Sequence, residues 1–338
     1  MYLSKRENGI YYLYFETDGR LKKISTRAKL KSEALRFLSN FQHELRRRKE
    51  SKLETIDIQQ FSFKFLRQFE PGHSPKSLAD YITTFRQLEK HFGNADLKTI
   101  GPNALAEYIA RRIRETSVYA ARKDYINLSA CFNWAVKNNF LLENPCKEIP
   151  KPRVPERLPI FFSEAEFQVL LAQIDSRDMK DLVLFAVNTG LRQMELLTLE
   201  WNQVNLERKS IVLDNRGHIT KSKKIRSVPL NDRASAVLQG RRDRTFGSLV
   251  FTMEGEPGRQ HKVSQGFKKY VRRTKLNPKL NFHSLRHTFA SWLVQRGVSI
   301  YQVSKLLGHS SVNVTAIYSH LQPDDLRDSV SKLVEETN

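Results

Sequence analysis

Residues 144–159 read NPCKEIPKPRVPERLP and hold five of the twelve prolines in a chain of 338 residues. Proline lacks the backbone N–H that a helix needs, and its ring fixes φ, so such a stretch is stiff and extended. We therefore expect residues 145–159 to form an interdomain linker that contains no helix. Ser163 and Glu166 have the spacing of a capping box, which predicts that a new domain opens with a helix directly afterwards.

Residues 57–144, before the linker, show only helical periodicity. Pro102 suits a first helical turn and Gly93 suits a helix end. The apolar positions predict four helices, at residues 61–69, 78–92, 102–114 and 118–138. This part of the chain is therefore expected to form a compact helical domain.

The N-terminal residues 1–52 have a different pattern. Residues 9–26 read GIYYLYFETDGRLKKIST, in which two β-prone runs flank an Asp-Gly pair that is typical of a tight hairpin turn. Residues 31–50 change to a helical period. We expect a small β-hairpin plus helix module, which is too small to be a catalytic unit.

Residues 160–338, after the linker, predict a mostly helical domain with one small sheet. In residues 210–230 the runs IVLD, HIT and IRSVPL predict three antiparallel strands. Pro323 and the following DDLRDSVSKLVEE predict a last helix with acids in its first turn. The predicted fold class is mainly α with small antiparallel β-sheets, with a helical domain and a mixed α+β domain beside the N-terminal module.

The charge of the chain indicates a polyanionic partner. Lys and Arg number 57 against 36 Asp and Glu, which gives a net charge of +21. Nucleic acid is the leading candidate, and a merely solvated basic surface is the alternative. Two cysteines argue against a disulfide framework or a cysteine-rich zinc site. We read no secretion signal and no membrane-spanning stretch, so we expect a cytoplasmic protein.

Three stretches place polar residues inside otherwise apolar helices. They read NTGLRQMELLTLEW at 188–201, FHSLRHTFASWL at 282–293 and LLGHSSVNVTAIYSHL at 306–321. Each polar residue alone has a plain explanation, since a lone histidine or tyrosine in a helix is more often structural than catalytic. His283 and His287, four residues apart, have the spacing of a metal pair, but Ser284 replaces the glutamate of the helical zinc enzymes. We therefore expect no metal and no cofactor.

Taken together, these stretches resemble the tyrosine recombinase (phage integrase) family. TGLRQMEL is similar to its first arginine box, HSLRHTFA to its His-x-x-Arg box, and LGHSSVNVTAIYSHL to its glycine-histidine and nucleophile box. The order and spacing also agree, with 23 residues from Arg286 to His309 and 9 from His309 to Tyr318. The resemblance covers residues 160–320 in motifs, and the helical domain before the linker in architecture only.

The resemblance implies a role for each motif residue. Arg192 and Arg286 would hold the scissile phosphate, and Tyr318 would be the nucleophile. His309 would donate a further hydrogen bond, and His283 would be the base or proton shuttle.

The turn TKSKKIRSVPL is similar to the family's β-hairpin that carries the catalytic lysine. Lys221 would be the acid for the leaving 5′-hydroxyl. Lys223 and Lys224 share the turn, and register against the strand at 228–230 favours Lys221. Glu195 matches a position that supports the arginine.

These residue types suit the chemistry independently of the family. Attack on a phosphodiester builds negative charge on its non-bridging oxygens, which two guanidinium groups can neutralise with paired hydrogen bonds. A phenol with a pKa near 10 becomes a nucleophile when a base or cations promote loss of its proton. A lysine can protonate the departing 5′-oxygen. Such a site needs no metal.

The resemblance implies a site-specific recombinase that joins strands through a 3′-phosphotyrosyl bond and a Holliday junction. Its implied partners are double-stranded DNA with specific attachment or recombination sites, three further copies of the chain in a homotetramer, and accessory DNA-bending or directionality proteins, with no membrane. Residues 57–144 would be the core DNA-binding domain and residues 160–338 the catalytic domain. Residues 1–52 resemble an arm-type DNA-binding domain, which favours an integrase of a phage or another mobile element.

Several alternatives stay open from the sequence. Chromosome or plasmid dimer resolution uses the same residues. A type IB topoisomerase shares the chemistry, and a non-catalytic DNA-binding regulator would explain the charge without the motif residues. The helix at residues 323–336 would dock on a neighbouring copy or pack within its own chain.

Overall fold

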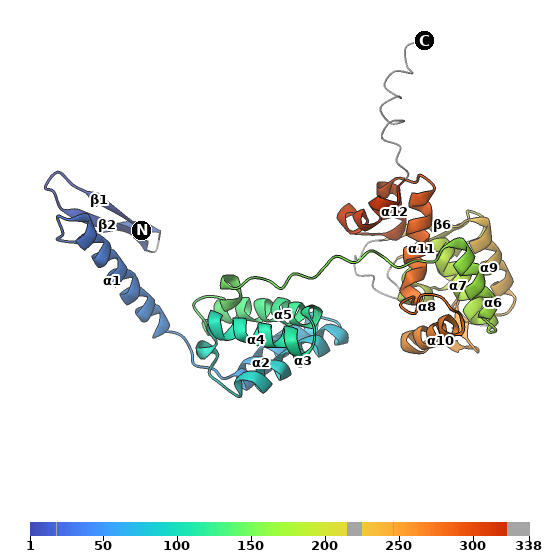
Figure 1. The fold of residues 1–338 in the computed structure, drawn as a ribbon, viewed down its shortest axis with the longest axis horizontal. Helices are drawn as coiled ribbons and strands as arrows, with labels where there is room; N and C mark the ends of the chain where they lie inside the picture. Colours follow the sequence, from blue (N-terminus) through green and yellow to red (C-terminus); the bar gives the residue numbers. More distant parts are fainter. Residues whose placement is uncertain (18, 215–224, 246, 323–338) are drawn as a thin grey trace, which may run out of the picture. The chain divides into compact units, whose positions relative to one another are not determined.

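The computed structural model describes residues 1–17, 19–214, 225–245 and 247–322 (Figure 1). The chain divides into two compact units, Met1–Glu156 and Arg157–Asn338, and the boundary between them falls inside the expected linker. Within the described ranges, no helix is long and apolar enough to cross a membrane. The expected helix after Pro323 lies outside the described residues.

The N-terminal module of unit 1 is a three-stranded antiparallel sheet with one helix. Its elements are β1 (Tyr2–Lys5), β2 (Tyr11–Thr17), β3 (Arg20–Ser25) and α1 (Lys31–Glu50), with strand order β1-β2-β3. Leu13 and Phe15 point from β2 to the side of the sheet on which α1 packs. The sequence predicted only the hairpin of β2 and β3, so the prediction missed strand β1. The missed turn contains Gly9 with φ +76°, and an Asn-Gly pair is itself a hairpin signal.

The rest of unit 1 is the expected set of four helices. They are α2 (Ile58–Phe69), α3 (Pro75–Phe92), α4 (Pro102–Glu115) and α5 (Val118–Lys137), joined by the short 3-10 turns η1 (Glu70–Gly72) and η2 (Leu97–Thr99). The side chains of Asp57, Ser74 and Ser117 cap the first, second and fourth helix by accepting backbone N–H bonds. Phenylalanines from three helices fill the core, where Phe61 contacts Phe85 edge to face.

The proline-rich segment differs from expectation at its start. Residues Pro145–Glu148 form a 3-10 turn, η3, and Cys146 is fully buried in the core of the helical domain. The prediction of no helix was wrong there, because proline is tolerated at a first helical turn, where its missing N–H would have no partner. Asn144 caps this turn by accepting from the Cys146 N–H. From Pro150 to Phe162 the chain has no helix or strand, as expected.

Unit 2 carries the remaining elements. They are α6 (Glu164–Gln173), α7 (Arg177–Thr189), α8 (Gln193–Leu197), η4 (Trp201–Gln203), β4 (Val204–Asn205), β5 (Ser210–Leu213), β6 (Arg226–Pro229), α9 (Asp232–Arg242), β7 (Thr252–Met253), β8 (Glu256–Pro257), α10 (Gln260–Arg273), α11 (Phe282–Gln295), α12 (Ile300–Leu307), η5 (Val312–Val314) and η6 (Ala316–Leu321). The capping box of Ser163 and Glu166 opens α6, as predicted. Helix α7 packs against α9 and α11 at the centre of the main core.

The expected three-stranded sheet exists, with a different third strand. Its order is β4-β5-β6, and Ile211 of β5 pairs with Val204 on one side and Val228 on the other. The HIT run lies outside the described residues. The two-residue strand β4 was too short to give an alternating pattern in the sequence.

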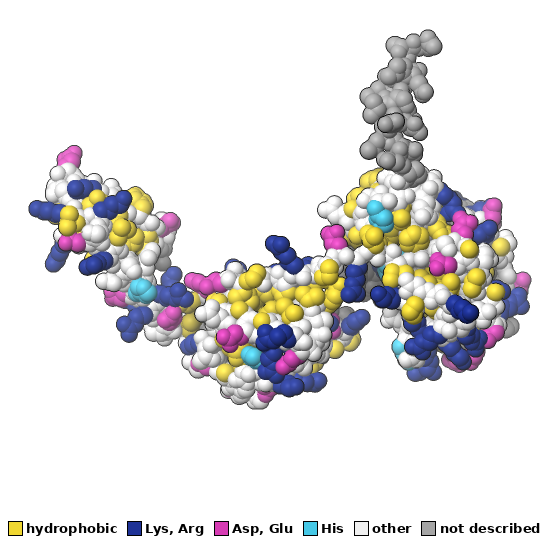
Figure 2. Space-filling view, in the orientation of Figure 1, with side chains coloured by type: hydrophobic (Ala, Val, Ile, Leu, Met, Phe, Trp, Pro, Cys, Tyr) yellow, Lys and Arg dark blue, Asp and Glu magenta, His cyan; other side chains and the backbone are white. Residues whose placement is uncertain are grey.

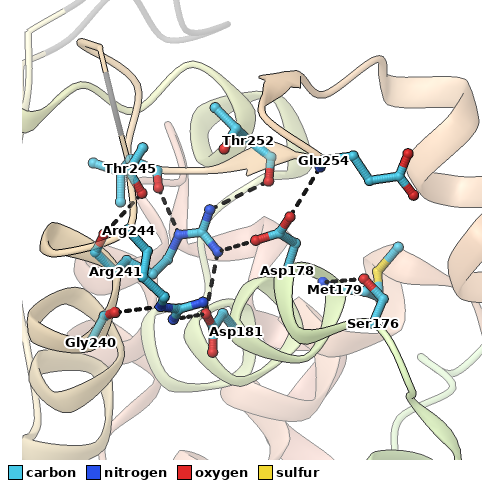
Figure 3. A network of polar contacts seen from close by, with 11 residues as sticks. Ser176, Asp178, Met179, Asp181, Gly240, Arg241, Arg244, Thr245, Thr252 and Glu254 are labelled. Carbon is cyan, nitrogen blue, oxygen red and sulfur yellow. Dashed lines mark hydrogen bonds and ion pairs between the residues drawn. The ribbon is translucent and has the colours of Figure 1, made fainter.

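A buried arginine fixes α9 to α7 (Figure 3). Arg241 is 2% exposed and donates to Asp178 at 3.0 Å, to Asp181 at 3.3 Å and to the Val250 carbonyl at 2.8 Å. Arg244 donates to the same Asp181 at 2.7 Å. A buried charge is tolerated only when it is paired and hydrogen-bonded, as here. This network holds the helix whose C-terminus leads into the candidate site.

Candidate active site

The first arginine box begins where α7 ends at Gly190. This glycine has φ +64°, and a Cβ built on it would lie 2.3 Å from Cδ1 of Phe289 on α11. Only glycine fits both the left-handed backbone and this close approach. The tight turn places Arg192 at the N-cap of α8, two residues after Gly190.

Glu195 of α8 links Arg192, which follows this turn, to Arg226 of β6. It accepts from Arg192 Nη1 at 2.9 Å and from Arg226 Nη2 at 2.6 Å, and it is 3% exposed. Burial raises the pKa of the Glu195 carboxyl, but the hydrogen bonds from Arg226 and Arg192 outweigh burial and hold the pKa below its ordinary value. Glu195 therefore stays ionised and orients Arg192, the support expected for it.

Arg286 joins the second box to the other two. It is 4% exposed and donates to the Gly190 carbonyl and the Leu307 carbonyl, both at 2.7 Å. Burial and the neighbouring Arg192 charge lower the pKa of its guanidinium to about 9, so it stays a cation at neutral pH. These two bonds use two of the five N–H donors of an arginine.

The third box places His309 near the guanidinium groups of Arg192, Arg226 and Arg286. Gly308 ends α12 with φ +63°, and a Cβ there would lie 2.7 Å from Cδ of Arg226. The Nδ1 atom of His309 is 2.7 Å from Thr315 Oγ1. Burial and the charges of Arg286, Arg192 and Arg226 lower the pKa of His309 to about 4. His309 is therefore neutral at physiological pH.

Tyr318 lies in η6 and is only 2% exposed. Its hydroxyl is 2.6 Å from Nδ1 of His287, which the sequence singled out only for its metal-pair spacing with His283. Burial raises the pKa of Tyr318 to about 12. Burial, with His283 and Arg286 nearby, lowers the pKa of His287 to about 4. The pair is therefore a neutral phenol bonded to a neutral imidazole.

The remaining predicted site residues are His283 and the lysines of the turn before β6. His283 is exposed at the start of α11, and its ring meets the His287 ring edge to face at 4.8 Å between centroids. Lys221, Lys223 and Lys224 lie outside the described residues. In the described part of the chain, no group of three or more His, Cys, Asp or Glu side chains has the arrangement of a metal site.

Known proteins share this arrangement of motifs. The profile of the Phage integrase family matches residues 161–325. A tyrosine recombinase XerC-like protein of Caldanaerobacter subterraneus subsp. tengcongensis is 33% identical over 248 residues, which cover 61% of this chain and 63% of that protein. Tyrosine recombinase XerD of Pseudomonas aeruginosa is 27% identical over 249 residues, covering 69% and 81%. These matches support a member of the tyrosine recombinase family.

Solved structures of integrases have the same fold as this chain. A lambda integrase dimer bound to a COC' core site has a TM-score of 0.69 at 17% identity and covers 94% of each chain. Tn1549 transposon integrase in complex with transposon right end DNA has a TM-score of 0.70 at 19% identity, covering 82% of this chain and 100% of that one. The predicted fold class is confirmed, and so is the predicted class of enzyme, one that cleaves and rejoins DNA strands.

The two partly buried histidines of this recombinase predict how its stability depends on pH. The folded chain holds the pKa of His287 and His309 at about 4, whereas an unfolded histidine titrates near pH 6.5. The unfolded state binds more protons between these values, so the free energy of unfolding falls as the pH drops from about 6.5 towards 4. We expect a loss on the order of 2 kcal/mol from His287 by pH 5 and a smaller loss from His309, because solvent screens the half-buried His309 more strongly. Urea unfolding at pH 7.5 and 5.0 measures this loss.

The double variant His287→Gln/His309→Gln should reduce this pH dependence. The exposed His261 of α10 provides the control, and His261→Gln should keep the wild-type dependence. If the free energy of unfolding fell equally with pH in the double variant and the wild type, His287 and His309 would not be the source of the pH dependence.

Proposed function

We propose that this recombinase acts at specific DNA sites through a 3′-phosphotyrosyl intermediate, and that it integrates or excises a phage or another mobile element. The convergence of three separate motif stretches carries the proposal. Arg286 bonds to Gly190 of the first box and Leu307 of the third. Tyr318 reaches the second box through His287.

The chemistry follows from this group of side chains. Arg192 and Arg286 hold the scissile phosphate and offset the charge that builds up on its oxygens. Tyr318 attacks the phosphorus, His309 donates a further hydrogen bond, and His283 accepts or passes on a proton. Lys221 protonates the leaving 5′-oxygen. The phosphotyrosyl bond conserves the energy of the broken linkage, so rejoining needs no ATP.

The N-terminal module supports the mobile-element assignment. Its face opposite α1 carries Tyr2, Tyr14 and Lys23 in one row across the three strands, with the two tyrosine rings stacked 5.1 Å apart. Arg6 donates to the Tyr14 hydroxyl at 2.6 Å. Such an aromatic and basic face suits a DNA duplex, so we assign residues 1–52 as an arm-type DNA-binding domain.

Basic helices of the catalytic unit suit the same partner. Figure 2 shows Lys and Arg side chains gathered near α10, whose sequence is QHKVSQGFKKYVRR. We propose that residues 57–144 and 160–338 hold duplex DNA. We also propose that four copies exchange strands through a Holliday junction, as in the lambda integrase tetramer bound to a Holliday junction, which has a TM-score of 0.66 at 18% identity. Accessory DNA-bending or directionality proteins, and a cytoplasmic location, stay predictions.

Dimer resolution of a chromosome or plasmid is the second candidate. The sequence relatives include recombinases named XerC and XerD. A distinguishing observation is the substrate pair: an integrase recombines two different attachment sites, whereas a resolution enzyme recombines two copies of one site.

The decisive experiment is a covalent-trapping assay with the full chain. Nicked duplexes carrying candidate attachment sequences are incubated with the protein in EDTA and run on a denaturing gel. We expect a covalent protein–DNA adduct, unaffected by EDTA because the arginines supply the positive charge. A scrambled duplex is the control and should give none.

Three outcomes would contradict the proposal. Binding to a confirmed cognate site without an adduct would indicate a regulator. Relaxation of a plasmid that lacks the site would indicate a topoisomerase. Loss of cleavage in EDTA would indicate a metal-dependent nuclease.

A further inference from the structure

His287 holds a position that the roles above leave without a function. It lies in α11 directly after Arg286, and its Nδ1 atom is 2.6 Å from the Tyr318 hydroxyl. The two rings are tilted by 50° with centroids 6.0 Å apart, so the contact is a hydrogen bond between edges and not a stacking contact. We propose that His287 is a further catalytic residue, which takes the proton of Tyr318 as the phenol oxygen attacks the phosphorus.

The helix holds His287 rigidly in this place. Thr288, the next residue, is fully buried, donates to the Ser284 carbonyl and accepts from the Phe162 backbone N–H. The Tyr318 ring belongs to a small core with residues of α11 and α12. Both partners of the hydrogen bond are therefore fixed by packing, which is what a proton acceptor at a reacting atom requires.

The proton transfer balances within the reaction, and this inference rests on the proposed function. As the Tyr318 oxygen bonds to phosphorus, its O–H bond breaks and the proton moves to Nδ1, which makes His287 an imidazolium. The bond from phosphorus to the 5′-oxygen breaks, and a general acid protonates that oxygen. On rejoining, the 5′-hydroxyl attacks, its proton returns to the acid, and His287 returns its proton to Tyr318.

The charges around the pair explain why it is neutral at rest. Arg286 and His283 face His287 from α11, and Tyr318 faces it from η6. The pKa of Tyr318 is about 12 and that of His287 about 4, so the proton stays on the phenol until bonding to phosphorus makes that oxygen strongly acidic. The exposed His283, in ring contact with His287, can then exchange the proton with solvent.

Two substitutions separate proton transfer from simple positioning. His287→Gln keeps an oxygen that accepts the Tyr318 hydrogen bond but cannot take up a proton, and His287→Ala removes both. In single-turnover trapping on the nicked duplex, we expect adduct formation about 100-fold slower than wild type for each variant. Tyr301→Phe on the exposed surface of α12 is the control and should match the wild type.

A second substrate assigns the defect to the nucleophile. A duplex with sulfur in place of the bridging 5′-oxygen has a leaving group that needs no general acid, so the loss should persist on it. A wild type that forms no adduct would overturn the proposed function and this inference together. A wild-type adduct with His287→Gln at an equal or higher rate would overturn the inference alone. Thermal melting checks that His287→Gln is folded. If His287→Ala does not fold, the rate of adduct formation by His287→Gln alone decides between proton transfer and positioning.

Discussion

Tyr318→Phe is expected to form no detectable covalent adduct with DNA while it still binds the cognate duplex. The substitution removes only the hydroxyl oxygen, which would form the bond to phosphorus in the proposed mechanism. The ring keeps its packing against Val294, Val303 and Leu307, and the lost hydrogen bond to His287 costs about 1 kcal/mol of stability. We expect a drop in cleavage of at least about 10⁴-fold, since no nucleophile replaces it.

The measurement pairs a denaturing gel for the adduct with a mobility-shift titration for binding. Tyr301→Phe is the matched control, because Tyr301 lies on the neighbouring helix α12 with 58% of its surface exposed. It should cleave and bind like the wild type. An adduct in Tyr318→Phe at the wild-type level would mean that another side chain attacks the phosphate.

The fold was largely predictable because its signals are local. The signals for the capping box at Ser163, for the pairing of β2 with β3 and for the helix at residues 31–50 each involve only neighbouring residues. These three features appear where expected. The missed elements are short. The strand β4 has two residues and η3 begins inside a proline-rich run, so neither has a periodic pattern to read.

The sequence predicts which residues to look for in the candidate site, but not the contacts between them. The motif spacing gave Arg192, Arg286, His309 and Tyr318, but sequence does not reveal which side chain meets the tyrosine hydroxyl. His287 meets it because η6 folds back onto α11, a contact between residues 31 positions apart. Arg226 was missed for the same reason, since its role depends on a contact from strand β6 to Glu195 of helix α8, 31 residues away in the sequence.

Arg286→Lys is expected to slow cleavage about 10³-fold, because the proposed phosphate contact and the internal contacts both need a planar guanidinium. Arg286 bonds to Gly190 and Leu307 in opposite directions along the chain, 96 and 21 residues away. A lysine is a point donor that does not span both carbonyls, so one of them loses its partner. We expect the free energy of unfolding to fall by about 1–3 kcal/mol as well.

The matched control for this variant is Arg241→Lys. Arg241 is equally buried in the same unit and bonds to Asp178 and to backbone carbonyls, but it lies in the α7–α9 network (Figure 3). This variant should lose stability and keep its cleavage rate per folded molecule, measured below the melting temperature of both variants. Added guanidinium ion should partly restore cleavage to Arg286→Ala, since it replaces the missing cation. Wild-type cleavage by Arg286→Lys would leave Arg286 a purely structural link between the three motif stretches, and the phosphate would then have to be held by Arg192 and its neighbours.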